Sequence, residues 1–143
     1  MDIQGYNIPE DLYYHDENAW VKVEQDGSVT VGMDDFYQKQ AGDTTYIDLP
    51  FEGDEVSQGE TCGKIQSSKW VGKLVSPISG EITEVNSELE NDCRLINKDS
   101  YGAGWIMKIK PSNLEDELKN LAHGPDALKK FIDDHVKKAQ SGG

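Results

Sequence analysis

The sequence predicts a mainly β domain, a small sandwich or barrel of short antiparallel strands, with helices added at its C-terminal end. Between residues 53 and 109, short apolar stretches are separated by Gly, Pro and Asn, which is typical of short strands joined by turns. Residues 20–24 alternate apolar and polar side chains, as a half-buried strand does. After Pro111 the pattern changes to that of capped, amphipathic helices.

The N-terminal part is expected to lead into a β-hairpin. Its first segment comprises residues 1–19, and a helical turn is expected over residues 9–14 because a proline, tolerated in the first turn of a helix, opens this stretch. Residues 20–24 and 29–31 then form the two strands of the hairpin, with a Gly-containing turn between them.

A short helix and further strands are expected next. Residues 32–42 carry acidic side chains at the start and Gly42 at the end, which suits the helix dipole and the preference for glycine after a helix. Residues 44–49 are β-rich, and Pro50 ends this strand. Four later strands are expected at residues 61–67, 71–76, 80–86 and 104–110.

The C-terminal part predicts two helices. Ser112 and Glu115 have the spacing of a capping box, so a first helix is expected to start at Ser112 and run to about residue 122. Pro125 opens a second helix, whose apolar side chains fall on one face. We expect residues 111–140 to pack on the β domain of residues 20–110, and residues 141–143 to form a frayed end.

Composition and charge restrict the classes of partner. The chain has 143 residues, enough for one domain, and a formal net charge of −13. That charge argues against binding to nucleic acid, whose phosphates require Lys and Arg, and it disfavours an anionic membrane surface. An acidic surface suits brief docking on basic partners, and it equally suits solubility or a saline or alkaline habitat. With no long apolar run and no signal-peptide pattern, the chain is expected to be cytoplasmic.

The sequence contains no pattern typical of a catalytic or metal site. Cys62 and Cys93 are too few for a disulfide framework and are expected to be buried and inert. The three histidines are far apart, and no metal-ligand spacing occurs. Nothing resembles a nucleophile with its base or a phosphate-binding loop. We therefore expect a protein that is not an enzyme.

Lys69 is the residue with the most informative surroundings. It lies in a short polar turn between two strand patterns, preceded by Ser67-Ser68 and followed by Trp70 and Gly72. An isolated lysine is usually only a solvated surface charge. Here the paired strands are expected to hold the turn rigidly away from the body, where another enzyme can reach the amine. This arrangement suits a lysine that is modified to carry a cofactor arm.

A series of motifs runs from about Trp20 to Ile109 in the order and spacing of one known family. They are Trp20-Val21-Lys22-Val23, Val31-Gly32, Gly42-Asp43, Asp48-Leu49-Pro50, Gly53-Asp54-x-Val56-x-x-Gly59-x-x-x-Gly63, Ser67-x-Lys69, Pro77-x-Ser79-Gly80, Val85-Asn86, Leu95-x-Asn97 and Tyr101-Gly102-x-Gly104-Trp105. With these motifs the sequence resembles the glycine cleavage H-protein family of lipoyl carriers. By this resemblance the fold is a lipoyl/biotinyl-type barrel-sandwich hybrid, and Lys69 carries lipoate in amide linkage within the hairpin context of Gln66, Ser67, Ser68 and Trp70.

Lipoate would make the chain a carrier for partner enzymes. Its dithiolane opens to a dithiol that can hold a carbon or sulfur fragment, and a tethered arm makes each transfer effectively intramolecular. Biotin is the competing group, but biotin carriers typically flank the lysine with methionines. The neighbours here are Ser68 and Trp70, which disfavours biotin.

Several positions depart from the usual family pattern. Gln66 stands where the family has Glu, and Trp70 adds a large side chain beside the lysine. The first strand reads Asn18-Ala19-Trp20 where the family tends to have His-Glu-Trp, and that His helps to hold the loaded arm. His15 is a candidate substitute, although a surface role is the simpler interpretation. Cys93 replaces a frequent Pro, and the C-terminal helix extends beyond the usual end.

These departures favour a sulfur carrier of cytoplasmic sulfur oxidation, working with a heterodisulfide-reductase-like complex. The alternative is the H-protein that carries the aminomethyl group in glycine cleavage. A third hypothesis, from another class, is an unmodified scaffold or regulator. For a carrier, the implied partners are a lipoate ligase or lipoyltransferase and the enzymes of one of these two pathways.

Overall fold

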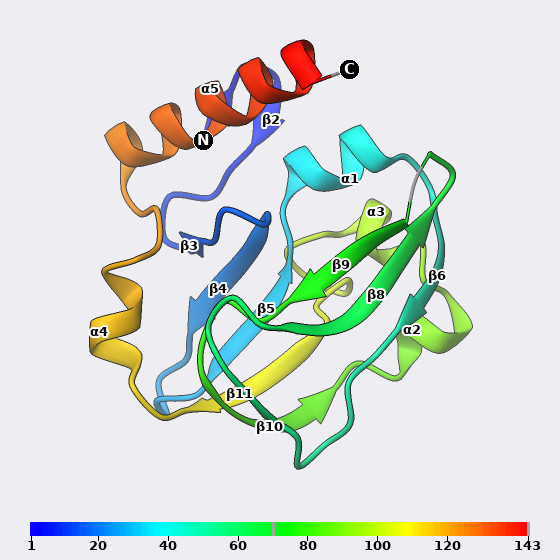
Figure 1. The fold of residues 1–143 in the computed structure, drawn as a ribbon, viewed down its shortest axis with the longest axis vertical. Coiled ribbons are helices and arrows are strands. Elements are labelled where there is room, and N and C mark those ends of the chain that lie inside the picture. Colours follow the sequence, from blue (N-terminus) through cyan, green and yellow to red (C-terminus); the bar gives the residue numbers. More distant parts are fainter. Residues whose placement is uncertain (70, 143) are drawn as a thin grey trace.

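The computed structural model describes residues 1–69 and 71–142, which form antiparallel sheets with helices around them (Figure 1). A six-stranded sheet has the order β3-β4-β5-β11-β10-β7, and a three-stranded sheet has the order β6-β8-β9. The strands β1 and β2 form a separate hairpin. The predicted mainly β architecture with added helices is therefore confirmed.

The element boundaries follow the predicted pattern closely in the β domain. The strands are β1 (Asp2–Ile3), β2 (Tyr6–Asn7), β3 (Tyr13–Tyr14), β4 (Ala19–Val23), β5 (Val29–Met33), β6 (Thr44–Asp48), β7 (Glu55–Val56), β8 (Thr61–Ser67), β9 (Val71–Val75), β10 (Gly80–Val85) and β11 (Met107–Pro111). The helices are α1 (Asp35–Ala41), α2 (Glu88–Asn91), α3 (Leu95–Lys98), α4 (Leu114–Leu118) and α5 (Pro125–Gly142).

The main hydrophobic core joins the two larger sheets. Alternation along each strand sends one set of side chains inward, so Ile65 and Leu74 of the small sheet share a cluster with Val31 and Ile109 of the large one, and all four are fully buried. Burying each such side chain contributes about 1.5–3 kcal/mol. This core fixes the position of the β8–β9 hairpin relative to the rest of the domain.

A second hydrophobic core lies on the other face of β4. Successive side chains of a strand point to opposite faces, so Val21 enters the main core while Trp20 enters a cluster with Phe36, Leu128 and Ile132. The Trp20 indole N–H donates to the carbonyl of Ser100 at 3.0 Å. The C-terminal helix α5 therefore covers the N-terminal segment and α1, as Figure 1 shows.

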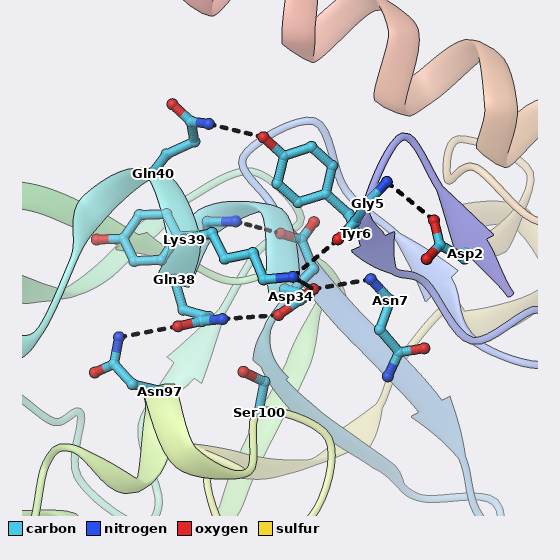
Figure 2. Close-up of polar contacts among 12 residues, drawn as sticks. Asp2, Gly5, Tyr6, Asn7, Asp34, Gln38, Lys39, Gln40, Asn97 and Ser100 are labelled. Carbon is cyan, nitrogen blue, oxygen red and sulfur yellow. Dashed lines mark hydrogen bonds and ion pairs between the residues drawn. The ribbon is translucent and has the colours of Figure 1, made fainter.

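Polar contacts also tie α1 to the N-terminal hairpin (Figure 2). The Lys39 ammonium donates to the carbonyl of Gly5 at 2.9 Å, and the Gln40 amide donates to the Tyr6 hydroxyl at 2.9 Å. The backbone N–H of Asn7 donates to an Asp35 carboxylate oxygen at 2.8 Å. These contacts add to the packing that holds α1 in one orientation.

The helical turn predicted over residues 9–14 is wrong, because Tyr13 and Tyr14 form the strand β3 beside β4. Backbone N–H and carbonyl groups of Tyr14 exchange hydrogen bonds with those of Ala122, each 2.9 Å long. Such a partner, distant in the sequence, overrides the local helical preference of the proline-initiated segment.

Both bounds predicted for the first C-terminal helix, Ser112 as its N-cap and an end near residue 122, are also wrong. The helix α4 begins at Leu114 after Asn113, without a side-chain cap, and it ends at Leu118. Ser112 instead extends the pairing of β11, since its N–H donates to the carbonyl of Ser79 at 3.0 Å. The second predicted helix is confirmed as α5, which includes residues 141 and 142 of the segment expected to fray.

Two short helices, α2 and α3, occupy a segment for which the sequence predicts no element, and β11 begins at Met107 instead of residue 104. Gly104 lies in a turn, where its N–H donates to the carbonyl of Asp99 at 2.9 Å. Among the described residues, no helix is long and apolar enough to cross a membrane.

The buried carboxyl of Asp34, at the N-terminus of α1, predicts a pH effect on stability. Burial away from water raises its pKa from 3.8 to about 7, although hydrogen bonds from Tyr37 N–H and the Asn18 amide favour the carboxylate. Below pH 3.8 the carboxyl is protonated in both states, and between 3.8 and about 7 only the folded state retains the proton. Asp34 therefore removes stability as the pH rises through this window, by up to about 1.4 kcal/mol per pH unit.

Asp34→Asn should flatten this part of the pH profile, because an amide does not titrate and can still accept the helix-capping bond. Urea unfolding between pH 4 and 8 measures the profile. The exposed Glu10→Gln is the control and should keep the wild-type slope. Parallel profiles for Asp34→Asn and the wild type would contradict the prediction.

Candidate functional site

Lys69 lies in the turn that joins β8 to β9. Cross-strand pairing places Gln66 opposite Val71, and of the described residues Ser68 and Lys69 lie in the connection between the two strands. Lys69 is exposed, and no ion pair involves it among the described residues. Trp70, predicted to flank the modified lysine, lies outside the described residues. The structure thus presents an accessible primary amine on a short turn.

The turn does not stand away from the body, in contrast to the sequence prediction. The N–H of Ser68 donates to the carbonyl of Asp43 at 2.9 Å, and the Thr45 hydroxyl donates to the carbonyl of Gln66 at 3.1 Å. Residues 42 and 43, the connector between α1 and β6, and the start of β6 therefore support the turn. Figure 1 shows the β8–β9 turn beside the C-terminal end of α1.

Gly42 is the residue of the connector that allows this close approach. Its backbone has φ 81° and ψ −161°, a conformation that is essentially restricted to glycine. A Cβ atom at this position would lie 2.5 Å from Ser68 Oγ and 3.8 Å from Cγ and Cε of Lys69. The aliphatic part of Lys69 therefore lies along Gly42, while the side chain as a whole stays exposed.

Asn97, on α3, holds the connector in place. Its side-chain oxygen accepts the N–H of Thr44 at 2.8 Å, and its amide group donates to the carbonyl of Gly42 at 2.8 Å. The same amide donates to the Gln38 side chain at 3.2 Å (Figure 2). One side chain thus satisfies backbone groups on both sides of Asp43, whose carbonyl binds the turn.

The sequence prediction did not assign Gly42, Asp43 or Asn97 to the site. They were present among the family-like motifs, as Gly42-Asp43 and Leu95-x-Asn97. Spacing along the chain does not reveal that these motifs lie beside Lys69, because helix α3 and the hairpin are brought together only by the fold.

The cysteines differ in their distance from this site. Cys93 is half-buried and its thiol donates to the carbonyl of Thr44 at 3.3 Å, beside the connector. It also lines a cleft of about 600 Å³ between β6 and α2. Cys62 lies further along β8, where burial and the nearby Glu60 raise the pKa of its thiol to about 11. The Cys62 thiolate, the reactive form, is therefore disfavoured.

His15 lies away from the turn. It is in the β3–β4 connection, where its Nδ1 accepts the N–H of Glu17 at 3.0 Å. Its Nε2 lies 4.0 Å from where a Cβ of Gly59 would be. The N–H of Gly59 donates to the carbonyl of Ser76. Ser76 follows the end of β9 that is remote from the turn, so His15 lies at the opposite end of the hairpin from Lys69. Burial lowers the His15 pKa.

Asn18, where the family pattern has His, has a structural role in this chain. Its backbone adopts φ 69°, which Asn tolerates better than most residues. Its side chain donates to the Asp34 carboxylate at 3.2 Å. The next residues, Ala19 and Trp20, are buried in the two cores.

Comparison with known proteins gives consistent results. A family model described as "Glycine cleavage H-protein" matches residues 12–135. A probable glycine cleavage system H protein of Pyrococcus abyssi is 47% identical over 121 residues, which cover 85% of this chain and 90% of the relative. Glycine cleavage system H protein 2 of Aquifex aeolicus is 43% identical over 131 residues, covering 91% and 81%.

A solved structure supports the fold prediction. The crystal structure of a glycine cleavage system H protein from Mycobacterium marinum superposes with a TM-score of 0.69 at 33% sequence identity. The match covers 78% of this chain and 97% of that protein. The barrel-sandwich architecture predicted by resemblance is therefore confirmed.

Gly42→Ala tests the contact between the connector and the turn. The added methyl group would displace Ser68, and the strained backbone costs about 1–3 kcal/mol. We expect lower stability and faster amide hydrogen exchange at Ser68. Gly27→Ala is the matched control: its φ of 89° carries a similar strain, but its Cβ would meet no atom within 4 Å. Equal protection of Ser68 in both variants would contradict the contact.

Proposed function

Because the chain belongs to the glycine cleavage H-protein family, we propose that it carries the aminomethyl group in the glycine cleavage system, with lipoate attached to Lys69. Members of this family bear lipoate covalently on a lysine and are carriers without catalytic activity of their own. The position of Lys69, exposed on a turn supported by Gly42 and Asp43, is the observation that carries the assignment of the residue.

The residues around Lys69 fit an amide-linked arm. Amide formation requires an amine that an enzyme can surround, and Lys69 is exposed without an ion pair in the described part of the chain. When bound, lipoate supplies a dithiolane that opens to a dithiol able to hold a fragment. The chain tethers that group and limits its volume, which raises its effective concentration at a docked enzyme.

The connector keeps the starting point of the arm fixed. The Ser68–Asp43 bond and the bonds of Asn97 to Gly42 and Thr44 restrain the backbone on which Lys69 sits. Only the side chain and the attached group then need to move. We infer that the partners are a lipoate ligase or lipoyltransferase and the enzymes of glycine cleavage.

The sulfur-carrier function, favoured by the sequence departures, has weaker support. The relatives compared above are named as glycine cleavage proteins. The departure at Asn18 has a structural explanation, since this residue supports Asp34 and adopts a positive φ. The other departures, at Gln66, Trp70, Cys93 and the longer C-terminal helix, still favour a different cargo, and the transfer assay below distinguishes the two pathways.

Lys69→Arg should abolish lipoylation while leaving the fold intact. Arginine keeps the charge but offers no amine for amide formation, and an exposed turn residue contributes little to stability. Intact mass after incubation with a lipoate ligase, lipoate and ATP measures the modification. Lys110→Arg, at another exposed lysine, is the control and should be modified like the wild type. An unmodified wild type would instead support a scaffold role.

The lipoylated protein should accept an aminomethyl group when incubated with glycine decarboxylase and glycine. Mass spectrometry of the Lys69 peptide identifies the cargo. The Lys69→Arg variant is the negative control. A lipoylated protein that remains unloaded, but gains sulfur from a heterodisulfide-reductase-like system, would contradict the glycine cleavage assignment and support the sulfur carrier.

A further inference from the structure

The hairpin that carries Lys69 has the opposite charge to the rest of the protein. Residues 61–75 contain Lys64, Lys69 and Lys73 and no Asp or Glu. Subtracting these three charges from the net charge of −13 leaves −16 on the remaining residues. The positive charge is therefore concentrated on the element that a modifying enzyme must approach.

Strand register places two of these lysines on one outer face. Lys64 of β8 pairs directly with Lys73 of β9, and directly opposed residues project to the same side of a sheet. Both are exposed. Ile65, the next residue along β8 after Lys64, is fully buried and marks the inner face. The outer face of the β6-β8-β9 sheet thus points to solvent.

The two lysines are not neutralised within the described part of the chain. Like charges directly opposed on neighbouring strands are destabilising, yet no ion pair is formed by Lys64 or Lys73 among the described residues. Asp48 of β6 is exposed in the same row and directly opposes Lys64, although it forms no ion pair with it. The row of Asp48, Lys64 and Lys73 therefore keeps a net charge of +1. A partner that supplies carboxylates would relieve this repulsion.

Exposed apolar side chains form the adjacent row, closer to Lys69. Tyr46 and Val71 lie on either side of Gln66 in the register, and they are 51% and 58% exposed. Both are among the few large apolar side chains that the described structure leaves exposed. The outer face therefore combines a largely apolar row next to the turn with a second row, of Asp48, Lys64 and Lys73, whose net charge is +1.

We propose that this outer face, formed by Tyr46, Gln66, Val71, Lys64 and Lys73, is the docking surface for the enzyme that attaches lipoate to Lys69. That enzyme is inferred to present carboxylates around an apolar patch. The proposal rests on the proposed function. Gln66 and Val71 directly flank the turn, so an active site that closes on the Lys69 amine also covers their row.

Charge complementarity favours this face over the other surfaces of the chain as the docking place of an acidic enzyme. An acidic docking surface is attracted by the hairpin and repelled by the body, whose charge is −16 after the hairpin lysines are removed from the total of −13. Such a field orients the encounter and speeds association. The overall composition of the chain suits basic partners. The charge of this hairpin has the opposite sign and suits an acidic partner.

The test compares two double variants with the same change in net charge. Lys64→Glu with Lys73→Glu reverses the outer face, whereas Lys110→Glu with Lys129→Glu reverses two exposed lysines elsewhere, on β11 and α5. Lipoylation rates are measured with the purified lipoate ligase of the source organism, lipoate and ATP at low and high salt. Circular dichroism verifies folding.

We expect kcat/KM of the hairpin variant to fall by about tenfold or more at low salt through a higher KM. The rate at saturation should be nearly unchanged, and the loss should shrink at high salt. The control should stay within about twofold of the wild type. Val71→Thr, which preserves strand propensity, should raise KM by a few-fold.

Equal losses in both double variants would show a bulk-charge effect and overturn the proposal, as would no loss in either. Lys64→Gln with Lys73→Gln, which removes the charges without reversing them, should give an intermediate loss; if the reversed pair fails to fold, this variant decides. A wild type that no ligase modifies would overturn the proposed function and this inference together. A modified wild type with an insensitive outer face would overturn only the inference.

Discussion

The hydrogen bonds that Asn97 makes to Gly42 and Thr44 hold the backbone against which the modifiable turn rests. The connector between α1 and β6 has no regular structure to satisfy its backbone groups, and buried or half-buried backbone groups require partners. Asn97 supplies them on both sides of Asp43, which leaves the Asp43 carbonyl free to accept Ser68 N–H. The position of Lys69 thus depends on a side chain of another element.

The same connector links the turn to the second core. Helix α1 ends at Gly42, and its other end is capped by the buried Asp34. Phe36 of α1 packs with Leu128 and Ile132 of α5. The C-terminal helix therefore acts on the site through α1, because a shift of α1 would move the connector on which the turn rests. This gives the C-terminal extension a structural role through its packing on α1.

Sequence reasoning located most of the strands because their patterns are local. Residues 20–24 were predicted from their alternation, and β8 from the Gly, Pro and Asn residues that separate short apolar stretches. The errors fall where a distant partner decides the local structure: Tyr14 pairs with Ala122, and Ser112 bonds to Ser79. The seating of the turn on Gly42 was missed for the same reason. The attachment lysine itself could be proposed from sequence, since its turn and flanking strands are contiguous.

Departures from a family pattern near a site do not by themselves indicate a new function. Asn18 replaces a residue that holds the arm in the family, but here it supports the capping carboxylate of α1.

The charges of the hairpin, unlike Asn18, have no structural explanation within the chain. Lys64 and Lys73 directly oppose one another and make no ion pair with the described residues. Amide formation turns the Lys69 ammonium into a neutral group, which leaves two of the hairpin's three lysine charges. An acidic attaching enzyme would then hold the product less strongly than the substrate, so the modification itself would favour release of the finished carrier.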